Sequence, residues 1–197
     1  MTAPAEPSRP ERDRRTTRQR IVEATILCVA RDGAAESSMA VIAAAAGVSK
    51  ALLHYHYSDR ARLLTEVVTQ VGTRLTTRAR TALDGVDGRR AIDALWRWQA
   101  DELARGELRV LLELSLVRDP QVHAASVTVA AARRQAAGDT MTTLLARLAL
   151  TPRVPVALLA EASVAFTDGL VLGRLVTNGD ARATFDVFWL AMLGLAE

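Results

Sequence analysis

Two histidines, two tyrosines and the chain's only lysine lie in one short segment, GVSKALLHYHYSD, at residues 47–59. Imidazoles beside a carboxylate suggest metal or acid–base chemistry, whereas lysine, imidazole and phenol side chains on one surface suit phosphates and base edges. Zinc-binding histidines on a helix favour i, i+4 spacing. His54 and His56 are two residues apart, about 200° around a helix, and cannot bind one ion. The spacing therefore favours a nucleic-acid-binding surface.

The helical period indicates which side chains of this segment face outward. Ser49 can cap a helix that runs from Lys50 to about Tyr57, with Leu53 and Tyr57 facing inward beside Val48. We expect the outward face to consist of Lys50, Ala51, Leu52, His54, Tyr55 and His56. A face of this composition is poorly suited to a core and well suited to a DNA groove.

The residues before this helix predict two partners for it. A first helix begins near Arg18, carries Cys28 as a small core residue and ends at Gly33. Ser37 or Ser38 can cap a second helix that runs to about Ala46, and Gly47 supplies the following turn. Two short helices joined by a glycine-containing turn form a helix-turn-helix.

These residues also carry a family resemblance. The segments RIVEA at 20–24, IA at 42–43, AGVSK at 46–50 and LHYHY at 53–57, together with Gly33, Arg60 and LL at 63–64, resemble the N-terminal domain of TetR-family transcriptional regulators. Two departures are His54, where the family usually has tyrosine, and Ala40-Val41, where polar residues are usual. The resemblance covers residues 16–64 closely.

The resemblance implies a site and a domain plan. It implies that base edges are contacted by Lys50, Ala51, Leu52, Tyr55 and His56, and that phosphates are contacted by Ser38, His54 and Arg60, with Ser49 in the same surface and Arg18 and Arg20 adding contacts. The domains are then a disordered arm at 1–15, a DNA-binding domain at 16–64 with its motif at 38–57, and a ligand-binding and dimerisation domain at 65–197.

Composition and charge agree with this plan. Half of the residues are hydrophobic and few are aromatic, no strand alternation persists, and the chain is expected to be all-α with about nine helices. Residues 1–64 hold ten basic and seven acidic side chains, whereas the remainder is balanced. A solvated basic tail is the alternative explanation of that excess. The single cysteine and the absence of an apolar leader or a long charge-free stretch predict a cytoplasmic protein without a membrane segment.

The C-terminal part is expected to pair two copies and to bind an effector. The two last helices, VALLAEASVAFTDGLVLGRLV and FDVFWLAMLGLA, are apolar enough to form a homodimer interface, although burial within one subunit would also explain them. A largely hydrophobic effector is expected in a cavity among the middle helices. The residues proposed to line it are Trp96, Leu111, Leu112, Glu113, Leu116, Met141, Leu145, Glu161, Phe166 and Asp168.

The resemblance further implies a repressor that binds a palindromic double-stranded DNA operator as a dimer and is released by the small molecule. An enzyme is disfavoured, because no nucleophile elbow, phosphate-binding loop or dinucleotide-binding motif occurs in the sequence. We therefore predict no catalytic residues, no metal and no cofactor. A helical protein-interaction module without DNA binding remains an alternative, because helix-turn-helix shapes are not restricted to DNA binding.

Overall fold

The computed structural model describes residues 9–176 and 179–197, which fold into nine α-helices and one short 3-10 helix, with no strand among them. This confirms the predicted all-α class. The helices are α1 (Arg9–Asp32), α2 (Met39–Ala45), α3 (Lys50–His56), α4 (Arg60–Thr81), η1 (Gly88–Arg90), α5 (Ala91–Arg105), α6 (Glu107–Ser115), α7 (Pro120–Leu148), α8 (Val156–Val176) and α9 (Ala181–Leu193).

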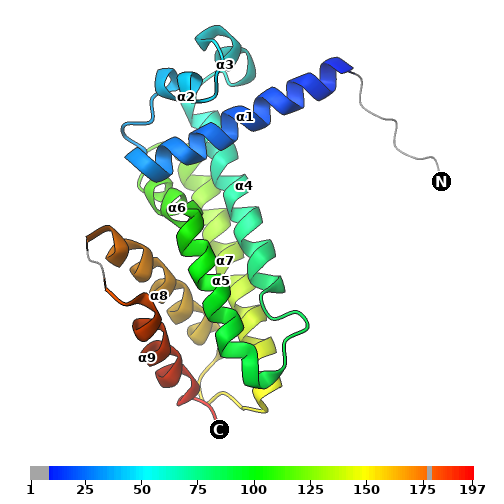
Figure 1. Ribbon diagram of the computed structural model, residues 1–197, viewed down its shortest axis with the longest axis vertical. Coiled ribbons are helices and arrows are strands. Elements are labelled where there is room, and N and C mark those ends of the chain that lie inside the picture. The colour runs from blue at the N-terminus through cyan, green and yellow to red at the C-terminus, as the bar shows by residue number, and fades with distance from the viewer. Residues whose placement is uncertain (1–8, 177–178) are drawn as a thin grey trace, which may run out of the picture.

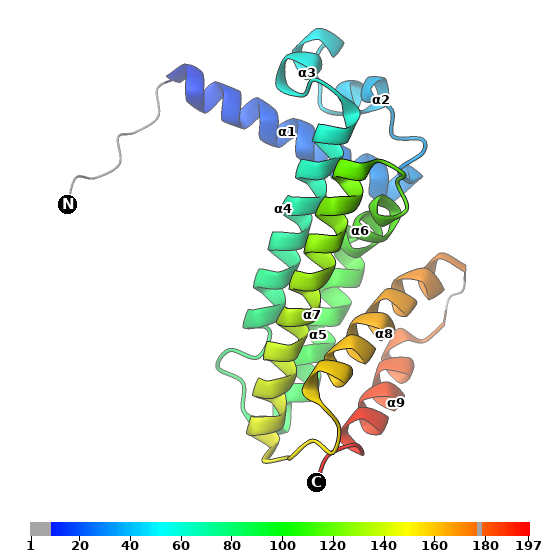
Figure 2. The ribbon, with the colours of Figure 1, turned by 180° about the vertical axis from the view of Figure 1, so that it is seen from behind.

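The helices form a small head at one end of an elongated body. α1, α2 and α3 lie across the end where α4 begins, and α4, α5 and α7 run along the long axis (Figure 1). α8 and α9 lie beside the far part of that bundle, as the view from behind also shows (Figure 2). The head therefore presents α3 at one extreme of the molecule.

The start of α1 differs from the prediction. Residues 9–15 were assigned to a disordered arm, but α1 begins at Arg9, and residues 1–8 lie outside the described part of the chain. Apolar periodicity, on which the prediction relied, is absent from this first stretch. Extending a helix that is already anchored is far easier than nucleating one, and arginine and glutamate are good helix formers.

One core unites the head with the upper body. Ile21, Ile42, Leu53 and Leu63, from four successive helices, have no exposed surface and pack in one cluster. The same cluster includes residues of α6 and α7, such as Leu114 and Val122. The head is therefore seated on the body by continuous hydrophobic packing rather than tethered by a linker.

A second core lies at the far end, where α5 and α7 meet α8 and α9. It contains Leu95, Leu144, Leu159, Phe185 and Trp189. α8 is the one helix in the described ranges that is long and apolar enough to cross a membrane by length and composition, and 22% of its most apolar window is buried. The prediction of no such segment rested on charge-free stretches, which Glu161 and Asp168 interrupt.

The closest packing in the body is between α4 and α7. A Cβ added at Gly72 of α4 would lie 2.5 and 2.6 Å from the two Cγ atoms of Val129 on α7. Val129 is β-branched and 9% exposed, so it has little freedom to move aside. Gly138 of α7 is different, because the nearest atom to an added Cβ is 4.0 Å away, on Ala160.

We expect Gly72→Ala to lower the free energy of unfolding by about 1–3 kcal/mol, because overpacking outweighs the gain in helix propensity. Gly138→Ala is the matched control and should be neutral or stabilising by up to about 1 kcal/mol. Chemical denaturation at fixed protein concentration measures both. Equal stabilisation by the two substitutions would contradict the close α4–α7 contact.

Candidate nucleic-acid interface

Local capping and a glycine turn set the direction of α3. The Ser38 hydroxyl accepts a hydrogen bond from the Val41 amide at the start of α2, and the Ser49 hydroxyl accepts one from the Leu52 amide at the start of α3. Gly47 between the helices has φ +62°, a conformation that favours glycine. The predicted helix-turn-helix geometry is therefore present, with Ser38 rather than Ser37 as the cap.

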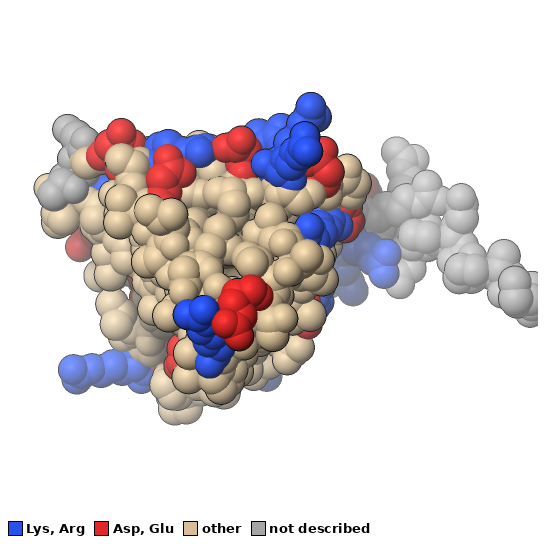
Figure 3. Space-filling model, turned by 90° about the horizontal axis from the view of Figure 1, so that it is seen from below, with Lys and Arg blue, Asp and Glu red and all other residues tan. Residues whose placement is uncertain are grey.

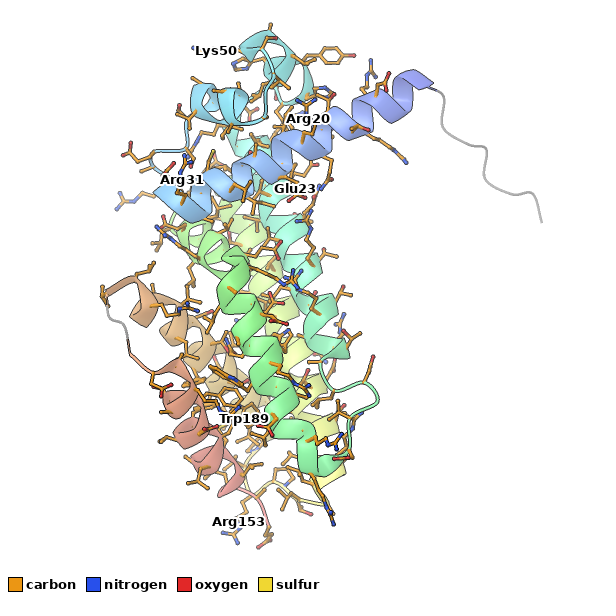
Figure 4. The ribbon with its side chains drawn as sticks, in the orientation of Figure 1. Arg20, Glu23, Arg31, Lys50, Arg153 and Trp189 are labelled. Atoms are coloured by element: carbon orange, nitrogen blue, oxygen red, sulfur yellow. The ribbon has the colours of Figure 1, made fainter. Side chains whose placement is uncertain are left out.

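The two faces of α3 are divided as expected. Leu53 and Tyr57 are 0% and 2% exposed and close onto the head core. Lys50 projects at the outer end of the head (Figure 4). The other exposed side chains of the helix are Ala51, Leu52, His54 and Tyr55, while His56 is half-buried.

Three arginines predicted to contact phosphate have hydrogen-bond partners within the head. The Arg20 guanidinium donates to the carbonyl oxygens of Ala46 and Gly47 at 2.7 and 3.3 Å, which fastens α1 to the turn before α3. The Arg60 guanidinium donates to the Ser37 carbonyl at 3.2 Å and to the Ala34 carbonyl.

Arg18 is also engaged within the head. It pairs with Glu66 on α4, and its guanidinium lies 4.9 Å from the centroid of the Tyr57 ring. Carbonyls at helix ends lack partners, and guanidinium groups satisfy them well. Arg18, Arg20 and Arg60 thus hold the head together, a role that sequence spacing does not reveal.

The first turns of α1 supply a basic side chain that the sequence analysis missed. The Arg14 guanidinium donates to the Tyr55 hydroxyl and lies 5.2 Å from the centroid of that ring. The Tyr55 ring in turn meets His56 edge-on at 5.4 Å. Burial, with Arg18 and Arg14 nearby, lowers the pKa of His56. Arg14 was assigned to the arm, and only the helical start of α1 brings it to α3.

Among the side chains that the structure describes, no three His, Cys, Asp or Glu residues lie close enough to hold a metal ion. Cys28 is buried, as predicted for a small core residue. Its pKa is raised, chiefly by that burial, which makes a reactive thiolate unfavourable.

A partly open cavity lies in the body, remote from α3. It has a volume of about 70 Å³ and is walled by α4, α5, α6, α7, α8 and α9. Trp189 points from α9 into the space between α9 and α5 (Figure 4). Much of the wall is aromatic, from Trp98, Phe166, Phe185, Phe188 and Trp189.

Comparison with known proteins decides the family. Residues 21–67 match the model of bacterial regulatory proteins of the tetR family. The N-terminal part of the chain therefore belongs to the TetR family. Its members are DNA-binding transcriptional regulators rather than enzymes, which supports the predicted absence of catalysis and speaks against an interaction module without DNA binding.

The whole TetR-family fold is shared with solved structures. A TetR-family transcriptional regulator from Agrobacterium tumefaciens is 19% identical, with a TM-score of 0.74 over 92% of this chain and 97% of that one. A putative TetR-family regulator from Rhodococcus sp. is 19% identical, with a TM-score of 0.72 over 91% and 98%. NalD, described as the secondary repressor of the MexAB-OprM multidrug efflux pump in Pseudomonas aeruginosa, is 21% identical, with a TM-score of 0.58 over 93% and 97%. Among curated proteins, none matches the sequence.

Most of the residues predicted to line an effector cavity lie outside the wall of this one. Met141 and Phe166 do lie in this wall. Trp96 lies outside it against Phe185, while its neighbour Trp98 lines it. Leu111, Leu112 and Asp168 instead line a second cavity, of about 150 Å³, between α4, α6, α7 and α8, where Asp168 pairs with Arg133. Leu145 packs in the far core, Glu113 accepts a hydrogen bond from the Ala34 amide, and Leu116 and Glu161 are exposed.

A chain of ion pairs links the head to the cavity wall. Arg74 of α4 pairs with Glu23 on α1 and with Glu107 on α6, the latter at 3.2 Å. Arg78, one turn later, pairs with Glu107 and, at 2.7 Å, with Glu102 on α5. Both pairings raise the pKa of Arg78, the one with Glu102 most. Because the Glu102 side chain is 1% exposed, its charge depends on Arg78.

We expect Arg78→Met to destabilise the protein by about 3 kcal/mol, because it leaves the buried Glu102 carboxylate without its main partner. Arg80→Met is the control on the same helix, since Arg80 and Asp139 form a pair with both side chains about half exposed; it should cost less than about 1 kcal/mol. Thermal and denaturant unfolding compare the two. Equal effects would argue against a structural role for the buried pair.

Proposed function

We propose that this TetR-family regulator is a cytoplasmic homodimeric repressor that binds a palindromic double-stranded DNA operator and is released by a small, largely hydrophobic effector. In this proposal, residues 16–64 read DNA, and residues 65–197 pair the subunits and bind the effector. The observation that carries it is the outward face of α3 at the tip of the head. The opposite end, viewed in Figure 3, is a largely uncharged surface with charges of both signs mainly along one edge.

The face of α3 has the chemistry for a major groove. Lys50 offers an ammonium donor for phosphate or guanine, and His54 and Tyr55 add donors and flat rings. Leu52, 39% exposed, and Ala51 suit contacts with thymine methyl groups. Ser38 and Ser49, exposed at their helix starts, lie beside amide groups that favour phosphate. We assign the phosphate role expected of Arg60 instead to Arg14 and Lys50.

The exposed apolar surface of the last two helices supports a dimer. α8 is apolar around most of its circumference yet little buried within one subunit. Burying this surface against a second copy of the chain would remove apolar area from water and stabilise a dimer. Such an interface would also explain why α8 is apolar enough to resemble a membrane span. The large exposed side chains on α8 and α9 are Leu158, Leu172, Leu175, Val176, Val187 and Leu190.

A pair of heads gives the required reading length. One short helix covers only a few base pairs, so a palindromic site read by two α3 helices about 34–36 Å apart provides useful specificity. The separation depends on α4, which begins in the head and contributes Leu75, Thr76 and Ala79 to the cavity wall. An effector that enlarges the cavity would displace α4 and favour a head spacing that does not fit DNA. The likeness to NalD, a repressor, favours repression.

We expect Lys50→Ala and Tyr55→Ala to weaken operator binding at least about tenfold each, through loss of base and phosphate contacts. Labelled duplexes that tile the promoter of the protein's own gene, titrated by fluorescence anisotropy at two salt concentrations, measure this. Lys50→Ala should also reduce the salt slope by about 1.

Arg153→Ala is the charge-matched control for Lys50→Ala. Arg153 lies at the end opposite the head and pairs with Glu197 at 3.0 Å (Figure 4). It should bind DNA like the unaltered protein. Absence of any duplex binding at low salt, or equal losses for Lys50→Ala and Arg153→Ala, would place the DNA surface elsewhere.

We expect Leu190→Glu to convert the dimer into a monomer, because it places a carboxylate in the proposed apolar interface. Leu116→Glu is the control, since Leu116 is 80% exposed, similar to Leu190 at 76%, and lies between α6 and α7. Size-exclusion chromatography with light scattering compares the two. A Leu190→Glu dimer would refute pairing through the last two helices.

A further inference from the structure

Three hydroxyl groups in the cavity wall already have partners on their own helices. The hydroxyls of Thr76, Thr140 and Ser163 donate to the carbonyl oxygens of Gly72, Ala136 and Ala160 at 2.9, 2.9 and 2.8 Å. Such hydrogen bonds leave these groups no need of a ligand. The wall they belong to is otherwise mainly hydrocarbon and aromatic ring.

Two N–H donors of α5 break this pattern. Gln99 is 2% exposed; its side-chain oxygen accepts from the Thr167 hydroxyl at 3.0 Å, but its amide nitrogen is buried and has no partner. The indole nitrogen of the adjacent Trp98 is likewise buried and unpaired. Among the described side chains of this wall, no other polar atom is buried without a partner. A buried donor left unpaired is costly, so both favour an acceptor in the cavity.

The cavity offers no free charge. Arg133 is the one charged residue of the wall, and its guanidinium donates to the Asp168 carboxylate at 2.6 Å. The Arg133 side chain is 11% exposed, so the pair is largely shielded from solvent. A charged ligand would lose its hydration here and find no free counter-ion, which disfavours both carboxylates and amines.

The aromatic wall favours a flat guest. The rings of Phe166 on α8 and Phe188 on α9 stack at 4.0 Å with an interplanar angle of 4°. Phe188 also meets Trp189 edge-on at 5.7 Å. The cavity volume of about 70 Å³ is small compared with ligand pockets of about 300–1,000 Å³. A ligand must therefore displace these aromatic side chains to enter. A planar ring can replace the stacking that it disrupts.

We infer that the effector is an uncharged aromatic molecule with a carbonyl-type hydrogen-bond acceptor, bound by the N–H groups of Gln99 and Trp98. The acceptor lies against α5, and the ring lies among Phe166, Phe188 and Trp189. The effect of this molecule on DNA binding rests on the proposed function. Its binding to the cavity does not and can be measured separately.

Three probes of similar shape test the chemistry: 2-acetylnaphthalene, which has a neutral acceptor, 2-isopropylnaphthalene, which has none, and 2-naphthoate, which is charged. Isothermal titration calorimetry on the full chain should give at least about tenfold tighter binding for the ketone than for the hydrocarbon, the gain expected from pairing buried donors. The carboxylate should bind most weakly. Equal binding of ketone and hydrocarbon, preference for the carboxylate, or no binding of any probe would overturn the inference.

Variants locate the acceptor. Gln99→Leu and Trp98→Phe, which remove an N–H and keep apolar bulk, should each reduce the ketone's advantage by about threefold or more. Trp96→Phe is the matched control, because Trp96 lies outside the cavity, and should leave the advantage unchanged. Circular dichroism confirms folding, and an unfolded Gln99→Leu is replaced by Gln99→Met. An advantage that survives both wall variants would also overturn the inference.

Operator binding is measured separately on the same samples. Protein that binds the ketone as described but no promoter duplex supports the inference and contradicts the proposed function. Protein that binds the duplex but discriminates none of the probes contradicts the inference alone.

Discussion

The close packing of α4 against α7 is the constraint on which the rest of the structure depends. α4 contributes Leu63 and Leu64 to the core beneath α3 and Leu75 to the cavity wall. Gly72 lets α7 approach α4 midway between those two regions. Because a helix resists bending, the position of its far part fixes the position of its near part. α4 is thus one rigid element that connects the head with the cavity.

Ion pairs reinforce this arrangement across the same helix. Arg74 and Arg78 connect α4 to α1 on the head side and to α5 and α6 on the body side. α5 contributes Trp98 and Gln99 to the cavity wall, and the same helix carries the buried carboxylate of Glu102. A shift of α5 therefore acts on α4 through charge as well as packing. This gives the proposed effector response a specific physical route.

Helix caps, turns and the buried face of α3 were predictable from the sequence, whereas contacts between residues far apart in the chain were not. Ser49, Gly33 and Gly47 act within a few residues, so their roles followed from helix-capping and turn chemistry. The burial of Leu53 and Tyr57 followed from the helical period. The pairing of Arg20 and Arg60 depends on carbonyls more than twenty residues away, which no local pattern indicates. The cavity depends on how six helices pack, so helical periodicity alone could not indicate which of Trp96 and Trp98 lines it.

The hydrogen-bonded arginines of the head have a consequence for how the protein searches a genome. Arg18, Arg20 and Arg60 donate hydrogen bonds to Glu66 and to backbone carbonyls, so part of the positive charge of the head already has partners within the protein. Attraction to arbitrary DNA scales with the phosphates neutralised, and it sets how long a protein slides before it detaches. In the proposed function, a head of this kind would dissociate readily from arbitrary DNA, and its residence on a site would depend on the match to α3.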